Sequence, residues 1–277
     1  RDVERSRGLG DVYKRQALSI INADPERQVV VVSAPGKRTE DDIKVTDLMI
    51  TYAYMSLRSN NYQDIATRIF KRYELIAQYF ELPEAELEDI NQLLLTLPKL
   101  SYPNNDYRMA TFKAHGERLN AILIAKILNH QGIKARFLEP KDVGLIVTGT
   151  SNNAEVNPET YVNLKRIKAA KDEKIIFPGF YGITPSGHIA TFSRGGSDIT
   201  GAILARGLNA DLYENFTDVD AIFSANPHIV DQPKPIKRMT YQEMRELSYA
   251  GFSVFHDEAL IPVSYTHLRA HETSLHL

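Results

Sequence analysis

Residues 177–208, FPGFYGITPSGHIATFSRGGSDITGAILARGL, form the stretch that decides the fold. The pattern predicts a strand, a turn, an extended segment at 191–193 and a glycine-rich loop at 194–198. Small and apolar residues then follow at helical spacing over 199–208, so the loop should lead into a helix N-terminus. Unpaired backbone N–H groups and the positive end of the helix dipole favour an anion there, and two glycines allow close approach of the backbone.

The same loop also fits an ordinary helix cap. In that interpretation Ser197 or Asp198 is the N-cap residue, and Gly195 and Gly196 form a tight turn. The neighbouring Arg194 and the motifs described below favour the anion-binding interpretation, because they add a fixed cation to the same loop.

Composition limits the class of protein. The chain has 277 residues, 43% of them hydrophobic, with a formal net charge of −2, which suits one large α/β domain or two small ones. Its apolar runs are too short to span a bilayer and its basic residues form no stripe, so we expect neither a membrane nor a nucleic-acid partner. The absence of cysteine excludes disulfides and thiolate chemistry, and it fits the cytoplasmic location that we expect.

The two ends of the chain differ from its middle. Residues 1–16 and 264–277 lack both helical and strand periodicity, and they resemble translated sequencing adapters, GDVYKRQ and VSYTHLRAHET. We therefore expect one domain over 17–263 with a non-native extension at each end. A rival interpretation places a metal site in the tail, where His267 and His271 are four residues apart and His276 follows.

Alternating strands and helices organise the middle. The β-branched run at 28–33 predicts a strand buried on both faces, and hence a mainly parallel sheet covered by helices. Ser33 then lies at the carboxyl edge of this sheet, where α/β proteins bind ligands. A helical lobe is expected over 45–97. Further strands are expected at 134–138, 144–148 and 174–177, and further helices at 115–132, 158–170 and 241–250.

Familiar catalytic motifs are missing from the chain. It contains no G-x-x-x-x-G-K-[ST], G-x-G-x-x-G, G-x-S-x-G or H-E-x-x-H sequence, so several nucleotide-binding designs, serine hydrolases and zinc proteases are unsupported. What remains is a group of polar residues predicted near strand or helix ends at one sheet edge: Ser33, Thr46, Glu117, Arg194, Ser197, Asp198, Thr217 and Asp218.

Several linked motifs, in order, resemble the amino acid kinase family and most closely its aspartate kinases. They are VVVSAPGK at 30–37, VTDLM at 45–49, HGERLNA at 115–121, PGF at 178–180, FSRGGSD at 192–198, TDVDAIFSANP at 217–227 and YQEMRELSYAGFSVFH at 241–256. The resemblance covers about 28–263. It implies a three-layer α/β/α sandwich with the helical lobe inserted after the first strand, and a partial kinase domain over 17–263.

The resemblance implies transfer of the ATP γ-phosphoryl group to the side-chain carboxylate of L-aspartate, with Mg²⁺, as the first step towards lysine, threonine and methionine. A carboxylate with a pKa near ~4 is already ionised at pH 7, so no general base is required. The obstacle is repulsion between two anions, which cations and aligned N–H donors must offset.

Residue roles follow from the same resemblance. Arg194 is suited to grip a carboxylate and Glu117 to receive an ammonium group, although a surface ion pair and a helix-dipole acid are the plain alternatives. The implied roles are contact with the amino acid for Ser33, Thr46, Glu117, Arg194 and Ser197, phosphoryl transfer for Arg194 and Asp198, and contact with ATP for Gly195, Gly196, Thr217, Asp218 and Phe223.

The sequence also departs from the family pattern. It lacks the lysine-phenylalanine-glycine-glycine motif that touches the phosphates, and His228 and Ser253 replace basic residues. We expect an impaired fragment, since loss of one transition-state cation costs about 10²- to 10³-fold. The resemblance implies a longer, homo-oligomeric parent with regulatory domains. The alternatives are a related glutamate, acetylglutamate, carbamate or nucleoside monophosphate kinase, a non-catalytic binding module, or an α/β domain with merely capped loops.

Overall fold

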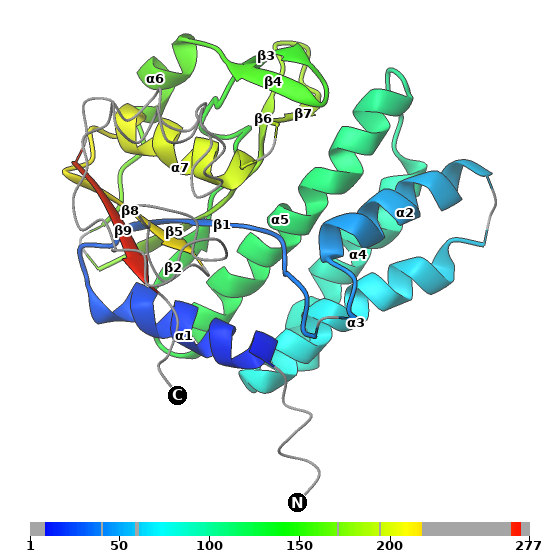
Figure 1. The fold of residues 1–277 in the computed structure, drawn as a ribbon, viewed down its shortest axis with the longest axis horizontal. Coiled ribbons are helices and arrows are strands. Elements are labelled where there is room, and N and C mark those ends of the chain that lie inside the picture. Colours follow the sequence, from blue (N-terminus) through cyan, green and yellow to red (C-terminus); the bar gives the residue numbers. More distant parts are fainter. Residues whose placement is uncertain are drawn as a thin grey trace, which may run out of the picture.

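A parallel sheet in the order β1-β5-β2 lies at the centre of the protein (Figure 1). Its strands are β1 (Val29–Val32), β5 (Lys174–Pro178) and β2 (Ala135–Phe137), and β5 pairs with both neighbours in parallel. The parallel sheet predicted from the β-branched run is therefore confirmed. The computed structural model describes residues 9–39, 41–58, 61–170, 172–193, 195–217 and 267–272.

The two faces of the sheet are buried in two different cores. Val30, Val32 and Ile176 belong to a core with the helices that precede β2, because alternate residues of a strand point to opposite faces. Val31 and Phe177 belong to a second core on the other face. Covering on both faces gives the three-layer α/β/α arrangement that the sequence predicted.

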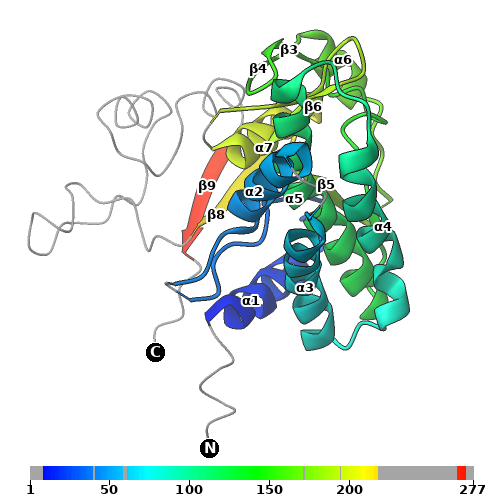
Figure 2. The same cartoon turned by 90° about the vertical axis from the view of Figure 1, so that its right-hand side faces the viewer.

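The first helical layer contains α5 (Asn105–His130) and the lobe that packs on it. Asn104 caps α5, since its side-chain oxygen accepts hydrogen bonds from the N–H groups of Asp106 and Tyr107, both at 3.0 Å. The predicted lobe after β1 is confirmed (Figures 1 and 2). It consists of α2 (Val45–Arg58), α3 (Gln63–Tyr79) and α4 (Glu88–Thr96), with 3-10 turns η1 (Glu84–Leu87) and η2 (Leu97–Lys99).

The other face carries α6 (Glu159–Leu164) and α7 (Gly196–Gly207), together with two antiparallel hairpins. The hairpins are β3 (Val147–Thr150) with β4 (Asn153–Val156), and β6 (Tyr181–Ile183) with β7 (Ile189–Thr191). The sequence predicted a single strand at 144–148 and missed β4. The reason is local, because the Thr150 hydroxyl accepts from the Asn153 N–H at 3.1 Å and the chain reverses there.

Both terminal segments contain regular structure that the sequence pattern did not predict. Helix α1 (Leu9–Ala23) begins inside 1–16, and β9 (His267–Glu272) pairs in parallel with β8 (Leu212–Thr217). The interpretation of His267 and His271 as a metal-binding pair on a helix is wrong, because a strand separates their Cα atoms by about 13 Å. The described ranges hold no group of three or more His, Cys, Asp or Glu suited to a metal. The foreign origin of both ends stays a prediction.

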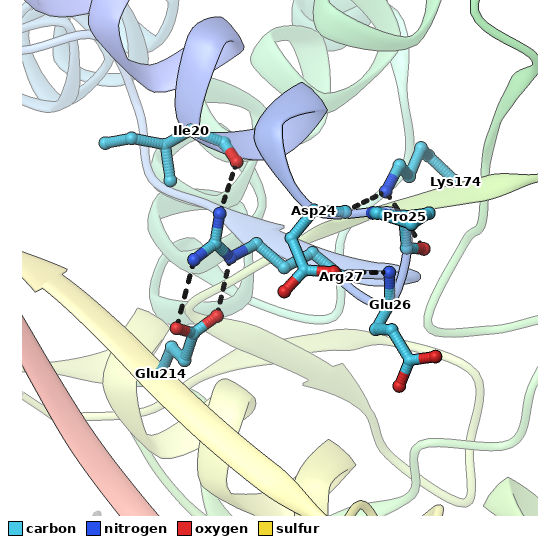
Figure 3. Close-up of polar contacts among 7 residues, drawn as sticks. All are labelled: Ile20, Asp24, Pro25, Glu26, Arg27, Lys174 and Glu214. Carbon is cyan, nitrogen blue, oxygen red and sulfur yellow. Dashed lines mark hydrogen bonds and ion pairs between the residues drawn. The ribbon is translucent and has the colours of Figure 1, made fainter.

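Polar contacts fasten the end of α1 to two strands (Figure 3). Arg27 donates to both carboxylate oxygens of Glu214 on β8, at 2.6 and 3.1 Å, and to the Ile20 carbonyl at 2.7 Å. Lys174 on β5 donates to the carbonyls of Asp24 and Pro25 at 2.8 and 3.3 Å. These bonds satisfy carbonyl groups at and just after the helix C-terminus, which lack intrahelical partners. None of the helices described here is both long enough and apolar enough to cross a membrane.

We predict that Arg27→Gln lowers the free energy of unfolding by about 1–3 kcal/mol, because it breaks a bidentate, charge-assisted contact between largely buried side chains. The relative exposures are 22% for Arg27 and 13% for Glu214. The control is Lys134→Gln in the Lys134–Asp172 pair, where the exposures are 59% and 77%. It should cost less than about 0.5 kcal/mol. Equal losses in urea unfolding of both variants would contradict this account.

Candidate functional site

Three segments meet at the carboxyl end of β1. Asn120 on α5 donates to the Ser33 carbonyl at 2.7 Å, and the Val45 N–H at the start of α2 donates to the Pro35 carbonyl at 3.2 Å. A Cβ atom on Gly116 would lie only 2.9 Å from the Cβ of Ala34, so α5 approaches this loop as closely as a glycine allows. The segments that carry Ser33, Thr46 and Glu117 are thereby brought together, as the sequence predicted. Glu117 lies in the middle of α5, however, because that helix begins at Asn105 rather than at 115 as predicted.

A buried arginine holds the loop between β1 and α2. Arg72 donates to the carbonyls of Ile43 and Gly36 at 2.8 and 2.6 Å, and it pairs with Asp42 at 3.0 Å. Hydrogen bonds from Arg38 and the charge of Arg72 keep the pKa of Asp42 well below its ordinary value. The loop that follows Ser33 is thus fixed at both ends rather than only at the strand.

Glu117 is the unusual group of this edge. Its side chain is 6% exposed, and its Oε2 atom has no hydrogen-bond partner among the described residues. Burial raises the pKa of Glu117 to about 8, although the backbone N–H of Ala34 and the charge of Lys113 oppose this shift. A buried acceptor without a donor costs about 1–3 kcal/mol, so an incoming cation with N–H groups would relieve it.

The glycine-rich loop and the PGF turn pack directly against each other. Gly195 has a left-handed φ of 73° and is the N-cap of α7. Cβ atoms at Gly196 and Gly179 would lie 2.5 Å from Phe180 Cδ2 and from Ser197 Oγ, respectively. Capping of α7 by Ser197 or Asp198 is therefore wrong. Close packing alone therefore requires glycine at positions 179 and 196, independently of any role in binding an anion.

Backbone contacts place this turn beside β1. The Gly179 N–H donates to the Val32 carbonyl at 3.0 Å, and the Phe180 N–H donates to the Thr200 hydroxyl at 3.0 Å. The same hydroxyl donates to the Gly196 carbonyl at 2.8 Å. Phe180 has a φ of 80°, which is uncommon for a residue with a side chain and is retained by these bonds. The N-terminus of α7 therefore lies at the same sheet edge as Ser33.

Asp198 connects α7 to β8. Its Oδ1 accepts from the Asn215 side-chain amide at 3.2 Å, and its carbonyl accepts from the Tyr213 hydroxyl at 3.2 Å. Thr217 is the last residue of β8, two positions beyond Asn215, so it lies at the end of a strand as predicted. Six residues named in the sequence analysis lie outside the described residues: Arg194, Asp218, Phe223, His228, Ser253 and His276. The helix predicted at 241–250 lies outside them as well.

Sequence reasoning missed Lys113. Its Nζ atom lies 5.6 Å from the centre of the Phe180 ring, and burial lowers its pKa. Lys113 stands one helical turn before Glu117 on α5, and this i, i+4 spacing could have identified it. Asn215 was missed as well, although strand alternation places it on the same face of β8 as Tyr213.

These features define a class of α/β protein whose ligands bind at the carboxyl ends of parallel strands beside a glycine-rich helix N-terminus. The model of the amino acid kinase family matches residues 10–271, and the chain belongs to that family. Aspartokinase 3 of Bacillus subtilis is 52% identical over 247 residues, which cover 89% of this chain and 54% of that protein. The chain thus spans about half the length of this relative.

Solved structures agree with the fold. The crystal structure of Clostridium acetobutylicum aspartate kinase aligns with a TM-score of 0.77 at 32% identity, over 94% of this chain and 57% of that chain. Escherichia coli aspartokinase III, solved with aspartate and ADP, aligns with a TM-score of 0.80 at 23% identity, over 97% of this chain and 60% of that chain. The second likeness supports the fold alone.

We predict that Glu117 makes the ligand-free protein less stable as the pH rises above neutrality. The folded state keeps a proton up to about pH 8, whereas the unfolded state releases it near the ordinary value of 4.5. The contribution of Glu117 is therefore complete below about pH 4.5 and is lost as the pH rises through 8. The free energy of unfolding in urea should fall by roughly 1.5 kcal/mol between pH 6.5 and 8.

Glu117→Gln should abolish this fall. The pH window avoids His115, whose pKa is lowered to about 3 by burial and by the charge of Arg118, so that it weakens the fold only below about pH 6.5. A parallel slope in the wild type and in Glu117→Gln between pH 6.5 and 8 would show that Glu117 is ionised in the folded protein.

Proposed function

We propose that this chain carries the acceptor site of an aspartate kinase, with ATP as phosphoryl donor. The observation that supports this most is the buried carboxyl of Glu117, with a free acceptor atom, at the edge of the sheet that also carries the glycine-rich start of α7. The identity to Bacillus subtilis aspartokinase 3 and the likeness to the Clostridium enzyme support aspartate over other acceptors.

The acceptor would be recognised by its charges. Glu117 receives the ammonium group, since an ammonium has three N–H donors and the Oε2 atom of Glu117 lacks one. Arg194 grips a carboxylate of the same molecule, with Ser33, Thr46 and Ser197 around it. Aspartate carries both groups on one short chain. Acetylglutamate and carbamate have no ammonium group, so Glu117 argues against them as acceptors.

The transfer itself needs little covalent help from the protein. The side-chain carboxylate of aspartate is ionised at pH 7 and attacks the γ-phosphorus, the bond to the β,γ-bridging oxygen breaks, and ADP leaves. Backbone N–H groups at Gly195 and Gly196 and the dipole of α7 stabilise the developing charge. Thr217, Asp218 and Phe223 hold the nucleoside.

Mg²⁺ would screen the phosphates when the nucleotide is bound. It usually keeps several waters and takes one or two carboxylates plus substrate phosphates, so the single half-buried carboxylate of Asp198 at the start of α7 fits it. We also propose a cytoplasmic location and, for the full-length parent, a homo-oligomeric assembly.

Aspartate binding should release a proton. At pH 7 a Glu117 with a pKa of about 8 is mostly protonated, and an ammonium ligand requires its ionised form, so about 0.9 proton should leave for each aspartate bound. Calorimetry of this chain in buffers of different ionisation enthalpy measures that number. Glu117→Gln should release none and should bind aspartate at least about 100-fold more weakly.

Two controls sharpen the binding experiment. Glu155→Gln changes an exposed carboxylate on β4 and should leave affinity and proton release unchanged. Arg194→Ala should abolish binding with the fold intact. Wild-type affinity in Arg194→Ala would favour the interpretation that the loop is merely a helix cap. Equal binding of succinate, which lacks the ammonium group, would argue against the role of Glu117.

Turnover is the second test. With the family's lysine-bearing strand restored in front of β1, ADP release coupled to aspartate should exceed that of the present chain by about 10²- to 10³-fold. Equal turnover with glutamate would refute aspartate as the acceptor, and Mg-ATP binding without turnover would favour a non-catalytic binding module.

A further inference from the structure

A second carboxylate, Glu139, lies in the loop that follows β2 and connects two elements of the site. Its Oε2 atom accepts from Arg118 Nε at 2.8 Å, and its Oε1 atom accepts from the Tyr181 hydroxyl at 2.8 Å. Arg118 follows Glu117 directly on α5, and Tyr181 follows Phe180 directly at the start of β6. One side chain therefore joins the helix of the carboxyl site to the turn beside the glycine-rich loop.

The hydrogen bonds of His115 on α5 determine which of its ring nitrogens carries the proton and which accepts from Arg118. Its Nδ1 lies 2.8 Å from the Thr111 carbonyl, which can only accept, so Nδ1 carries the proton. Its Nε2 lies 3.0 Å from Arg118 Nη1 and must then accept. The ring is therefore neutral, which agrees with its lowered pKa, and the Arg118 guanidinium is held on two sides.

Tyr181 reaches the other half of the site. Its ring is fully buried, so its hydroxyl depends on the Glu139 carboxylate for a partner. The residue before it, Phe180, contacts Gly196 closely, and Gly179 lies against Ser197. A shift of Tyr181 would therefore be transmitted to the start of α7, because those contacts leave no free space.

We propose that Glu139 is a positioning residue for the amino-acid acceptor. By holding Arg118 on one oxygen and Tyr181 on the other, it sets the spacing between the ammonium-binding carboxyl of Glu117 and the loop at Ser197. Arg118 already balances its charge, so Glu139 does not compete with Glu117 for the ammonium group. This inference rests on the proposed aspartate site, and it concerns the acceptor rather than ATP.

The test compares two Arg–Glu pairs, one with its carboxylate in the loop after β2 and one with its arginine on β2. Arg136 of β2 pairs with Glu173 at 3.0 Å, much like the 2.8 Å pair of Arg118 and Glu139, but neither partner contacts the site. Glu139→Gln removes the charge and Glu139→Asp keeps both oxygens. Tyr181→Phe deletes only the hydroxyl, and Glu173→Gln is the matched control.

We expect Glu139→Gln and Tyr181→Phe each to weaken L-aspartate binding to this chain by about tenfold or more, and to weaken Mg-ATP binding by a smaller factor because ATP shares only the start of α7 with the acceptor. Glu139→Asp should recover most of the affinity, and Glu173→Gln should bind as the wild type. Equal weakening of aspartate and Mg-ATP binding would overturn the proposal, because the ion pair would then only support the fold. An effect no larger than that of Glu173→Gln would also overturn it, because the pair would then not influence binding.

A ligand-free measurement separates this inference from the proposed function. If the wild type binds no aspartate, the proposed function fails. Amide hydrogen exchange in the ligand-free protein then tests the positioning role of Glu139. The Phe180 N–H, bonded to Thr200, should exchange about tenfold faster in Glu139→Gln than in Glu173→Gln. Equal exchange in the two variants would overturn the positioning role.

Discussion

The parallel pairing of β1 with β5 is the constraint on which the rest of the structure depends. It aligns Val32 with Pro178, so both strands end at the same edge and the loops that follow them emerge side by side. Alternation along the strands then sends Val30 and Ile176 into one core and Val31 and Phe177 into the other. Helix α5 approaches that edge from the first core and α7 from the second, and the site forms where they meet.

The buried side chain of Glu117 destabilises the fold of the ligand-free protein. A buried carboxyl with an unpaired oxygen opposes folding, and in a region of close packing such a group is usually eliminated. Here the surrounding residues keep it in place, because Tyr73 donates to the Gly116 carbonyl at 2.9 Å and Gly116 packs on Ala34. A cationic group can therefore bind without displacing a protein donor, and it has to displace only the proton that Glu117 holds at pH 7.

Much of this was predictable from local signals. The β-branched run found β1, and helical periodicity found α7 and the part of α5 from residue 115 onward. The ordered motifs led to the prediction that Glu117, Ser197 and Asp198 belong to one site. The prediction failed where local signals were weak. Strand β4 is short and polar. Helix α1 begins inside the aperiodic segment 1–16, and its later residues Leu18 and Ile21 are buried only by contacts with distant residues of the first core. No pattern connects Glu139 to Tyr181, because they are 42 residues apart.

The sequence by itself determined the parallel sheet and the kinds of group at its edge, because these depend on side-chain chemistry and on periods of 2 and 3.6 residues. It indicated the family through the resemblance of its ordered motifs. Only the tertiary structure decided which of those groups lack partners and which are held. Whether Glu117 is buried, whether Arg72 fastens the loop after β1, and whether Gly196 faces Phe180 all depend on contacts between distant segments. Desolvation and close packing act through such contacts, and no local window of the chain contains them.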